Sequence, residues 1–593
     1  MTHTHTRNTT HTTHTTINSI NNSIITQKRS YTNTLTKSFS RLTGDALIYP
    51  NRTHPPQITT YIVNKNKKKK KKKNTNTNTN DANNTPDTPN SSSSASTSTS
   101  TPTPSSTPQD LSSSPSSSLP SPPSLDPPSS ILPPPCTGVS LPPITLEPLI
   151  KIRASGDNQQ TEVQVTDVDG IKVGSLEKSG GMTTLGVCVG AGSKWEADDT
   201  RGVCQAMELM ALKPGGGADV PATLDSLGAQ VYALSGRDNY TVSVDCLRDN
   251  VEEAAKIWKA CVMDGTYEDE DVEECKHIMT WINSDLPSPE LLREGMMSAA
   301  YPSQPLGNPH FCPLGSVAGV TGSKLRGWRD RFFKRGNMFV GAAGIEHAKA
   351  VDIVGTLFAD VPPGPPEPSA PSVYSGGEFR LLEPNNQDGL TRVAVAFEVG
   401  GWHGPDMVPV CVLQTLLGGG DSFSAGGPGK GMYSRLYREV LNRCYWAEAA
   451  ECFIMLHNDA GLIGISGASV PSMSQNLTYQ ILEQFAKLSY QPVTDEELSR
   501  AKNMLRCNVL TQLESRQILA EDLVRQFQTY GERVDPADVC ARIDAVTKDD
   551  IRRVAQTAMS GPPSVSAVGP NLDKCPTFEQ MKHIRGKDDL IVR

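Results

Sequence analysis

The order of apolar and polar positions repeats once between residues 146 and 593. In each copy a strand-like alternation is followed by a polar loop, a helix-like apolar spacing and three glycines. The strand, helix and glycines are 185–192, 202–212 and 215–217 in the first copy, and 393–401, 407–417 and 418–420 in the second. A repeat of this length indicates two homologous domains.

The downstream parts of the two copies also correspond. Residues 317–326 parallel residues 543–552, and each stretch holds a threonine, Thr321 or Thr547, where a helix N-cap belongs. Strand-like residues follow at 338–343 and 565–568. Each domain is therefore expected to end on a capped helix and a strand.

A proline-rich stretch separates the copies. Residues 361–377 cannot continue a helix or an interior strand, so they form the predicted linker. The predicted domains are 146–360 and 378–593. The predicted fold class is α+β, with a mixed sheet in each domain and helices packed on one face.

Residues 46–145 have low complexity and few apolar side chains, so they predict a disordered linker. The run of seven lysines at 67–73 has two readings, a basic nuclear or nucleic-acid tail and a solvated linker, and the Asn/Thr surroundings favour the linker. Since the formal net charge is −8 even with this run, the folded part is more acidic still. Such a surface suits basic peptides and not nucleic acid.

Residues 1–45 predict a mitochondrial transit peptide. The first acidic residue is Asp45, and the stretch before it is basic and rich in Ser and Thr. The expected location is the mitochondrial matrix, with possible association with the inner membrane. No run of 18 apolar residues predicts a membrane span, and the thirteen cysteines form no CxxC pair, which indicates a reducing compartment.

Strand, polar loop, helix and glycines, in duplicate, resemble the pitrilysin-type peptidase family, M16. Its active members carry His-x-x-Glu-His on the first long helix, where two histidines on one face hold zinc and the glutamate polarises water. Here the ligand positions hold Gln205 and Leu209, and Glu208 alone survives, in the base position. The family's third ligand is a glutamate about 75 residues on. The stretch 276–288 offers only Asp285, in a register that looks wrong.

The resemblance therefore implies no catalytic residue, no metal site and no cofactor in this chain, with zinc expected in a partner subunit. Glu208 is interpreted as a relic of the base position; a partner-facing charge and a solvated residue are the alternatives. An active stand-alone metallopeptidase is disfavoured by Gln205 and Leu209.

The glycine-rich loop at 417–431 is the most specific segment. Such a sequence indicates sharp bends or close approach of the backbone to a ligand. A nucleotide-binding loop is disfavoured because Lys430 is followed by Gly431 and the segment follows a helix. A mobile surface loop is the remaining alternative.

Residues 422–437 look nearly unaltered from the loop that distinguishes the alpha subunits of mitochondrial processing peptidases within that family. The resemblance implies that the loop binds presequences. The implied substrate-binding residues are Gly418, Gly419, Gly420, Ser422, Phe423, Ser424, Gly426, Gly427, Pro428, Gly429, Lys430 and Gly431. Asp421 departs from the family pattern, which has a small residue there.

The predicted function is thus a non-catalytic, substrate-recognising subunit. It forms a heterodimer with a zinc-containing beta-type subunit, which cleaves the bound presequences of mitochondrial precursor proteins. The alternative is a structural core subunit of the respiratory cytochrome bc1 complex, whose relatives share the fold and also lack metal ligands.

Overall fold

The computed structural model describes residues 162–215, 220–383, 386–422 and 431–582. The predicted transit peptide (1–45) and low-complexity linker (46–145) lie outside these ranges, as do residues 146–161 of the predicted first domain. In the part of the chain that the structure describes, no helix is both long and apolar enough to cross a membrane.

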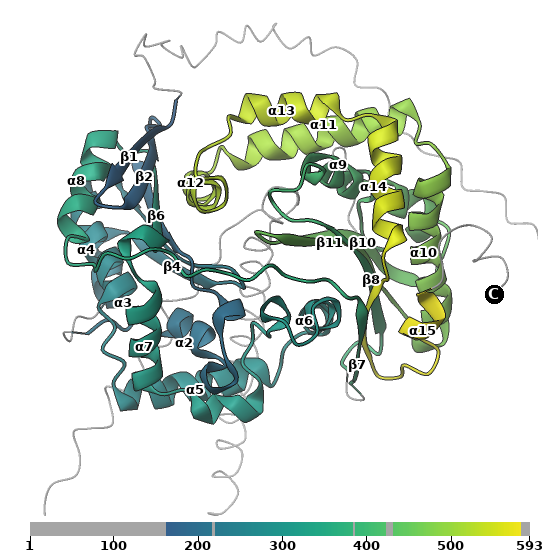
Figure 1. The fold of residues 1–593 in the computed structure, drawn as a ribbon, viewed down its shortest axis with the longest axis horizontal. Coiled ribbons are helices and arrows are strands. Elements are labelled where there is room, and N and C mark those ends of the chain that lie inside the picture. The colour runs from purple at the N-terminus through teal and green to yellow at the C-terminus, as the bar shows by residue number, and fades with distance from the viewer. Residues whose placement is uncertain (1–161, 216–219, 384–385, 423–430, 583–593) are drawn as a thin grey trace, which may run out of the picture. The chain divides into compact units, whose positions relative to one another are not determined.

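The first half builds a six-stranded sheet (Figure 1). Its strands are β1 Gln164–Val168, β2 Ile171–Leu176, β3 Met182–Val189, β4 Gln230–Ser235, β5 Tyr240–Leu247 and β6 Met338–Ala343. Their order across the sheet is β1-β2-β6-β3-β5-β4, and β2 pairs with β6 in parallel while the other neighbours are antiparallel.

The second half builds a sheet of matching connectivity. Its strands are β7 Gly377–Leu382, β8 Thr391–Gly400, β9 Gly419–Asp421, β10 Ala447–Leu456, β11 Ala460–Ser469 and β12 Ser564–Gly569. The order is β7-β12-β8-β11-β10-β9, again with one parallel pair, β7 with β12. The repeat read from the sequence is therefore a repeat of topology over five strands, with β1 as an additional edge strand in the first half and β9 in the second.

Each half also contributes a set of helices. In the first half they are α2 Val203–Met210, α3 Val220–Leu227, α4 Val251–Met263, α5 Asp269–Asn283, α6 Ser288–Ala300, α7 Gly322–Phe332 and α8 His347–Leu357. In the second half they are α9 Met407–Leu417, α10 Ser474–Tyr490, α11 Asp495–Gln512, α12 Arg516–Tyr530, α13 Pro536–Ala545, α14 Lys548–Ser560 and α15 Phe578–Met581. One large apolar core lies within each half.

Local sequence signals located several elements closely. Helix α9 has the bounds that were predicted, and β6 coincides with the predicted strand 338–343. Thr321 and Thr547 cap α7 and α14 by accepting a backbone N–H with the side-chain oxygen, as predicted. Between α8 and β7 there is neither a helix nor a strand, and the predicted linker lies in this interval except for Gly377, which begins β7.

The second face of each sheet is covered by one helix from the other half, which the sequence did not predict. Helix α6 packs on β12, β7 and β8, while α12 packs on β6 and β3. Both contacts are close, because a Cβ at Gly174 of β2 would lie 2.1 Å from Phe527 Cε2 of α12, and one at Gly295 of α6 would lie 2.0 Å from Phe379 Cδ1 of β7. The exchange joins the halves into one folded unit.

Candidate functional site

Helix α2 carries Gln205, Glu208 and Leu209, the residues that the sequence resemblance assigns to the peptidase motif. Gln205 is buried there, and its amide pairs reciprocally with the amide of Asn283 at the end of α5. Gln205 Nε2 donates to Asn283 Oδ1 at 2.8 Å, and Asn283 Nδ2 donates to Gln205 Oε1 at 3.0 Å. Oε1 also accepts the N–H of Cys312 at 2.9 Å, while Asn283 Nδ2 donates to Cys312 O at 2.8 Å.

Asn283, not Asp285, is the residue that α5 brings to Gln205. Sequence reasoning considered only carboxylates in this stretch and therefore did not single Asn283 out. The sequence does contain a signal for the pair, because Asn283 carries a side-chain amide 78 positions after that of Gln205, near the place where the family's third ligand was expected.

The residues at these positions do not fit a zinc ion. Leu209 packs against the apolar core, and the amides of Gln205 and Asn283 already bond to each other. In the described ranges no three His, Cys, Asp or Glu side chains are grouped so that they could hold a metal. The site has hydrogen bonding in place of metal ligation.

Glu208 has structural contacts. Its Oε2 accepts the backbone N–H of Ser235 at 3.0 Å and the Ser235 hydroxyl at 2.6 Å, which ties α2 to the end of β4. Burial raises the pKa of the Glu208 carboxyl to about 7, although the two bonds from Ser235 oppose this shift. These bonds give a reason to retain the residue without catalysis.

A second buried carboxylate, Glu196, lies at the start of α2. It accepts the N–H groups of Gly202 at 3.0 Å and Cys204 at 2.8 Å. Because the N-cap residue, Gly202, has no side chain that could accept these bonds, Glu196 caps the helix in its place. Burial raises the pKa of Glu196 to about 7 against the effect of these bonds. Sequence reasoning missed this residue because the cap lies six positions before Gly202.

The glycine-rich segment begins where α9 ends. Gly418 has φ +56° and Gly419 has φ +104°, backbone conformations that side-chain-bearing residues rarely adopt. A Cβ on Gly419 would lie 2.0 Å from Ala450 O. These glycines turn the chain out of the helix and allow β9 to pair with β10. The fold therefore requires glycine at these positions whether or not a ligand binds.

Both described ends of the loop are held in place. Ser422 N donates to Glu448 O at 2.7 Å, and Gly419 N donates to Ser434 Oγ at 3.2 Å. Gly420 and Gly431 are described as well. The remaining predicted binding residues lie outside the described residues; they are Phe423, Ser424, Gly426, Gly427, Pro428, Gly429 and Lys430.

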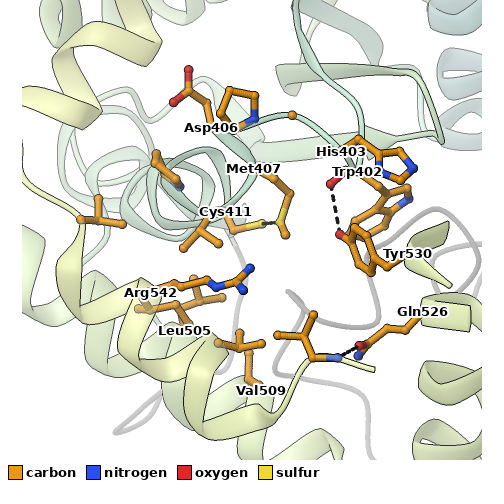
Figure 2. A pocket seen from close by; sticks show the side chains of 18 of the residues that line it. Trp402, His403, Asp406, Met407, Cys411, Leu505, Val509, Gln526, Tyr530 and Arg542 are labelled. Atoms are coloured by element: carbon orange, nitrogen blue, oxygen red, sulfur yellow. Dashed lines mark hydrogen bonds between the residues drawn. The ribbon is translucent and has the colours of Figure 1, made fainter. Parts of the chain in front are cut away.

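A cavity of about 700 Å³ lies elsewhere in the second half, between the loop before α9 and helices α11 to α14 (Figure 2). Three of its acids are paired with arginines: Asp406 and Asp550 with Arg553, at 2.7 and 3.0 Å, and Asp522 with Arg525 at 2.6 Å. Tyr530 donates to Trp402 O, which closes one side, as Figure 2 shows. Sequence reasoning had assigned no binding role to these residues.

Comparison with known proteins places both halves in one family. Residues 173–314 match the family described as Insulinase (Peptidase family M16), and residues 319–505 match the Peptidase M16 inactive domain. A solved chain from Complex III2 of Candida albicans, with Inz-5 bound, has a TM-score of 0.62 at 16% identity and covers 72% of this chain and 100% of that chain. That likeness shows the fold alone.

Several curated proteins are similar over most of the chain. "Probable mitochondrial-processing peptidase subunit alpha-1, mitochondrial" of Arabidopsis thaliana is 32% identical over 472 residues, which is 78% of this chain and 91% of that protein. "Mitochondrial-processing peptidase subunit alpha" of Homo sapiens is 30% identical over 465 residues, 74% of this chain and 88% of that protein. The chain belongs to the M16 peptidase family, in the group of mitochondrial-processing peptidase alpha subunits.

Proposed function

We propose that the chain is the non-catalytic, substrate-recognising alpha subunit of a mitochondrial processing peptidase. It binds the N-terminal presequences of imported precursors through the glycine-rich loop at 417–431, and a zinc-containing beta-type subunit cleaves them. The observation that carries the proposal is that Gln205, which the resemblance assigns to a zinc-ligand position, is bonded to the side-chain amide of Asn283. The names of the related alpha subunits support the assignment.

The loop is proposed as the recognition element on physical grounds. Its two described ends are anchored to β10 and to Ser434, so the residues between them are presented from a fixed base. Exposed backbone groups can pair with an extended peptide. Residues 1–45 are proposed as the chain's own transit peptide and the mitochondrial matrix as its location, in keeping with the mitochondrial names of the relatives.

A presequence-cleavage assay tests the proposal. The purified chain, a beta-type partner and the reconstituted pair are each given a fluorogenic presequence peptide. Cleavage is expected only with the pair, and Glu208→Gln in this chain is expected to leave the kcat of the pair unchanged. Cleavage by the chain alone, or loss of kcat with Glu208→Gln, contradicts a non-catalytic role. Equal cleavage by the partner alone supports the scaffold role of a bc1 core subunit.

A further inference from the structure

A pocket of about 900 Å³ lies at the base of the glycine-rich loop. Its walls are the last turn of α9, helix α11 and residues 431–434, where the chain returns from the loop. Ser434, in this wall, is also the residue whose hydroxyl accepts the N–H of Gly419. The pocket therefore adjoins both anchored ends of the loop.

The lining of this loop-base pocket is mostly apolar, and its charged side chains are paired. Leu416, Met432, Tyr433 and Met504 contribute the apolar surface, and the Tyr433 side chain is 73% exposed. Both charged groups of the lining are engaged: Glu497 pairs with Arg435 at 3.2 Å, and Arg500 pairs with Glu496. The pocket thus suits an uncharged, aliphatic group.

One buried polar group in the lining lacks a partner. Asn508 is 6% exposed, and its Nδ2 donates to no acceptor among the residues that the structure describes. A buried donor that is left unpaired destabilises the folded chain. An acceptor supplied by a ligand, such as a peptide carbonyl, would recover this cost.

The edge of the sheet beside the pocket is suited to an extended chain. Ser422 N and Gly418 O bond to β10, so the alternation of an antiparallel ladder turns the backbone groups of Gly419 and Asp421 away from β10. Gly419 N reaches Ser434 in the pocket wall. In the described sheet β9 is the edge strand, which leaves the N–H and C=O of Asp421 free for a peptide backbone.

We infer that the loop-base pocket is a subsite for an aliphatic side chain of the precursor presequence, with the Asn508 side-chain amide donating to a backbone carbonyl of the peptide. The inference rests on the proposed function and assigns a specificity role to α11. An extended peptide is chosen over a small molecule because Ser434, in the pocket wall, also bonds to Gly419 of the edge strand β9, and because Gly431, at the described end of the loop, lines the pocket.

Binding of a fluorescein-labelled presequence peptide to the reconstituted pair, followed by anisotropy, tests the subsite. Met504→Trp fills the pocket and is expected to raise Kd about tenfold or more. Leu510→Trp is the matched control, because Leu510 lies on the same helix at 48% exposure and outside the lining. A peptide with its aliphatic residues replaced by serine is expected to bind weakly and to be insensitive to Met504→Trp.

Asn508→Leu separates binding from stability. Because the Nδ2 donor has no partner, the change is expected to keep or raise the melting temperature while raising Kd about fivefold. Cys507, which is exposed in the lining, gives a direct readout, since the peptide is expected to slow its alkylation but not that of Cys444 or Cys540.

The outcomes distinguish this inference from the proposed function. If replacing the loop weakens binding while Met504→Trp, Asn508→Leu and Cys507 alkylation show no effect, the subsite is wrong and the recognition role stands. If replacing the loop residues 423–430 also leaves Kd unchanged, the proposed recognition role itself is wrong. A lower melting temperature for Asn508→Leu with unchanged Kd assigns Asn508 to structure and overturns its role in binding.

Discussion

Replacing Gln205 and Asn283 singly and together tests whether hydrogen bonding holds the former metal position. Gln205→Leu leaves Asn283 Oδ1 without its donor and the buried N–H of Cys312 without an acceptor. Asn283→Leu leaves Gln205 Nε2 without its acceptor and the Cys312 carbonyl without its donor. A buried polar group left unpaired costs about 1–3 kcal/mol, so each single change is expected to cost about 2–3 kcal/mol.

The double variant removes both amides and leaves the N–H and the C=O of Cys312 as the groups still unpaired. Its cost is therefore expected to fall short of the sum of the single costs by about 1–2 kcal/mol. Hydrogen exchange of the α2 and α5 amides is the suitable assay, because it reports the local free energy of opening and does not assume that both halves unfold together. Costs that add within about 0.5 kcal/mol would refute a coupled amide pair.

Three other outcomes follow from the described contacts. The pKa of Glu196 and of Glu208 is raised from 4.5 to about 7, so between these pH values the folded chain retains protons that the unfolded chain releases. The stability of the fold is therefore expected to fall as pH rises through this window. Glu208→Gln is expected to make the melting temperature depend less on pH in a thermal-shift assay. Burial alone would raise the pKa of Asp238, but His457 and Lys194 hold it well below its usual range. Asp238→Ala is therefore expected to lower the free energy of unfolding by about 3–5 kcal/mol, which limited proteolysis of the predicted linker at 361–377 would report as faster cleavage. In the wild-type chain the contacts of Asp238 with His457 and Lys194 are expected to contribute less stability as the pH falls below 3.8. Gly419→Ala, which puts a Cβ against Ala450 O, is expected to raise KM for presequences, and an unchanged KM would contradict the need for an ordered β9.

Local signals in the sequence predicted the elements well, because a helix period or a cap is decided by neighbouring residues. Helix α9 and the caps of Thr321 and Thr547 are of this kind. The interpretation that the metal motif is lost also rests on local information, since Gln at 205 is a weak zinc ligand and Leu at 209 cannot bind a metal.

The parts that were not predicted depend on residues far apart in the sequence. The amphipathic pattern of α6 and α12 predicts that each helix buries one face, but it does not predict that this face packs on the sheet of the other half. The pairing of Gln205 with Asn283 is fixed by the packing of α2 on α5. The loop-base pocket likewise needs α11 to lie beside residues that precede it by more than sixty positions.

The most direct test of the recognition role is steady-state cleavage by the reconstituted pair in which residues 423–430 are replaced by a Gly/Ser stretch of equal length. This change keeps β9, Ser434 and the pocket lining intact. The account predicts that KM rises about tenfold or more while kcat stays within about twofold, because the loop binds substrate and the partner performs the chemistry. An unchanged KM, or equal cleavage by the partner without this chain, would contradict it.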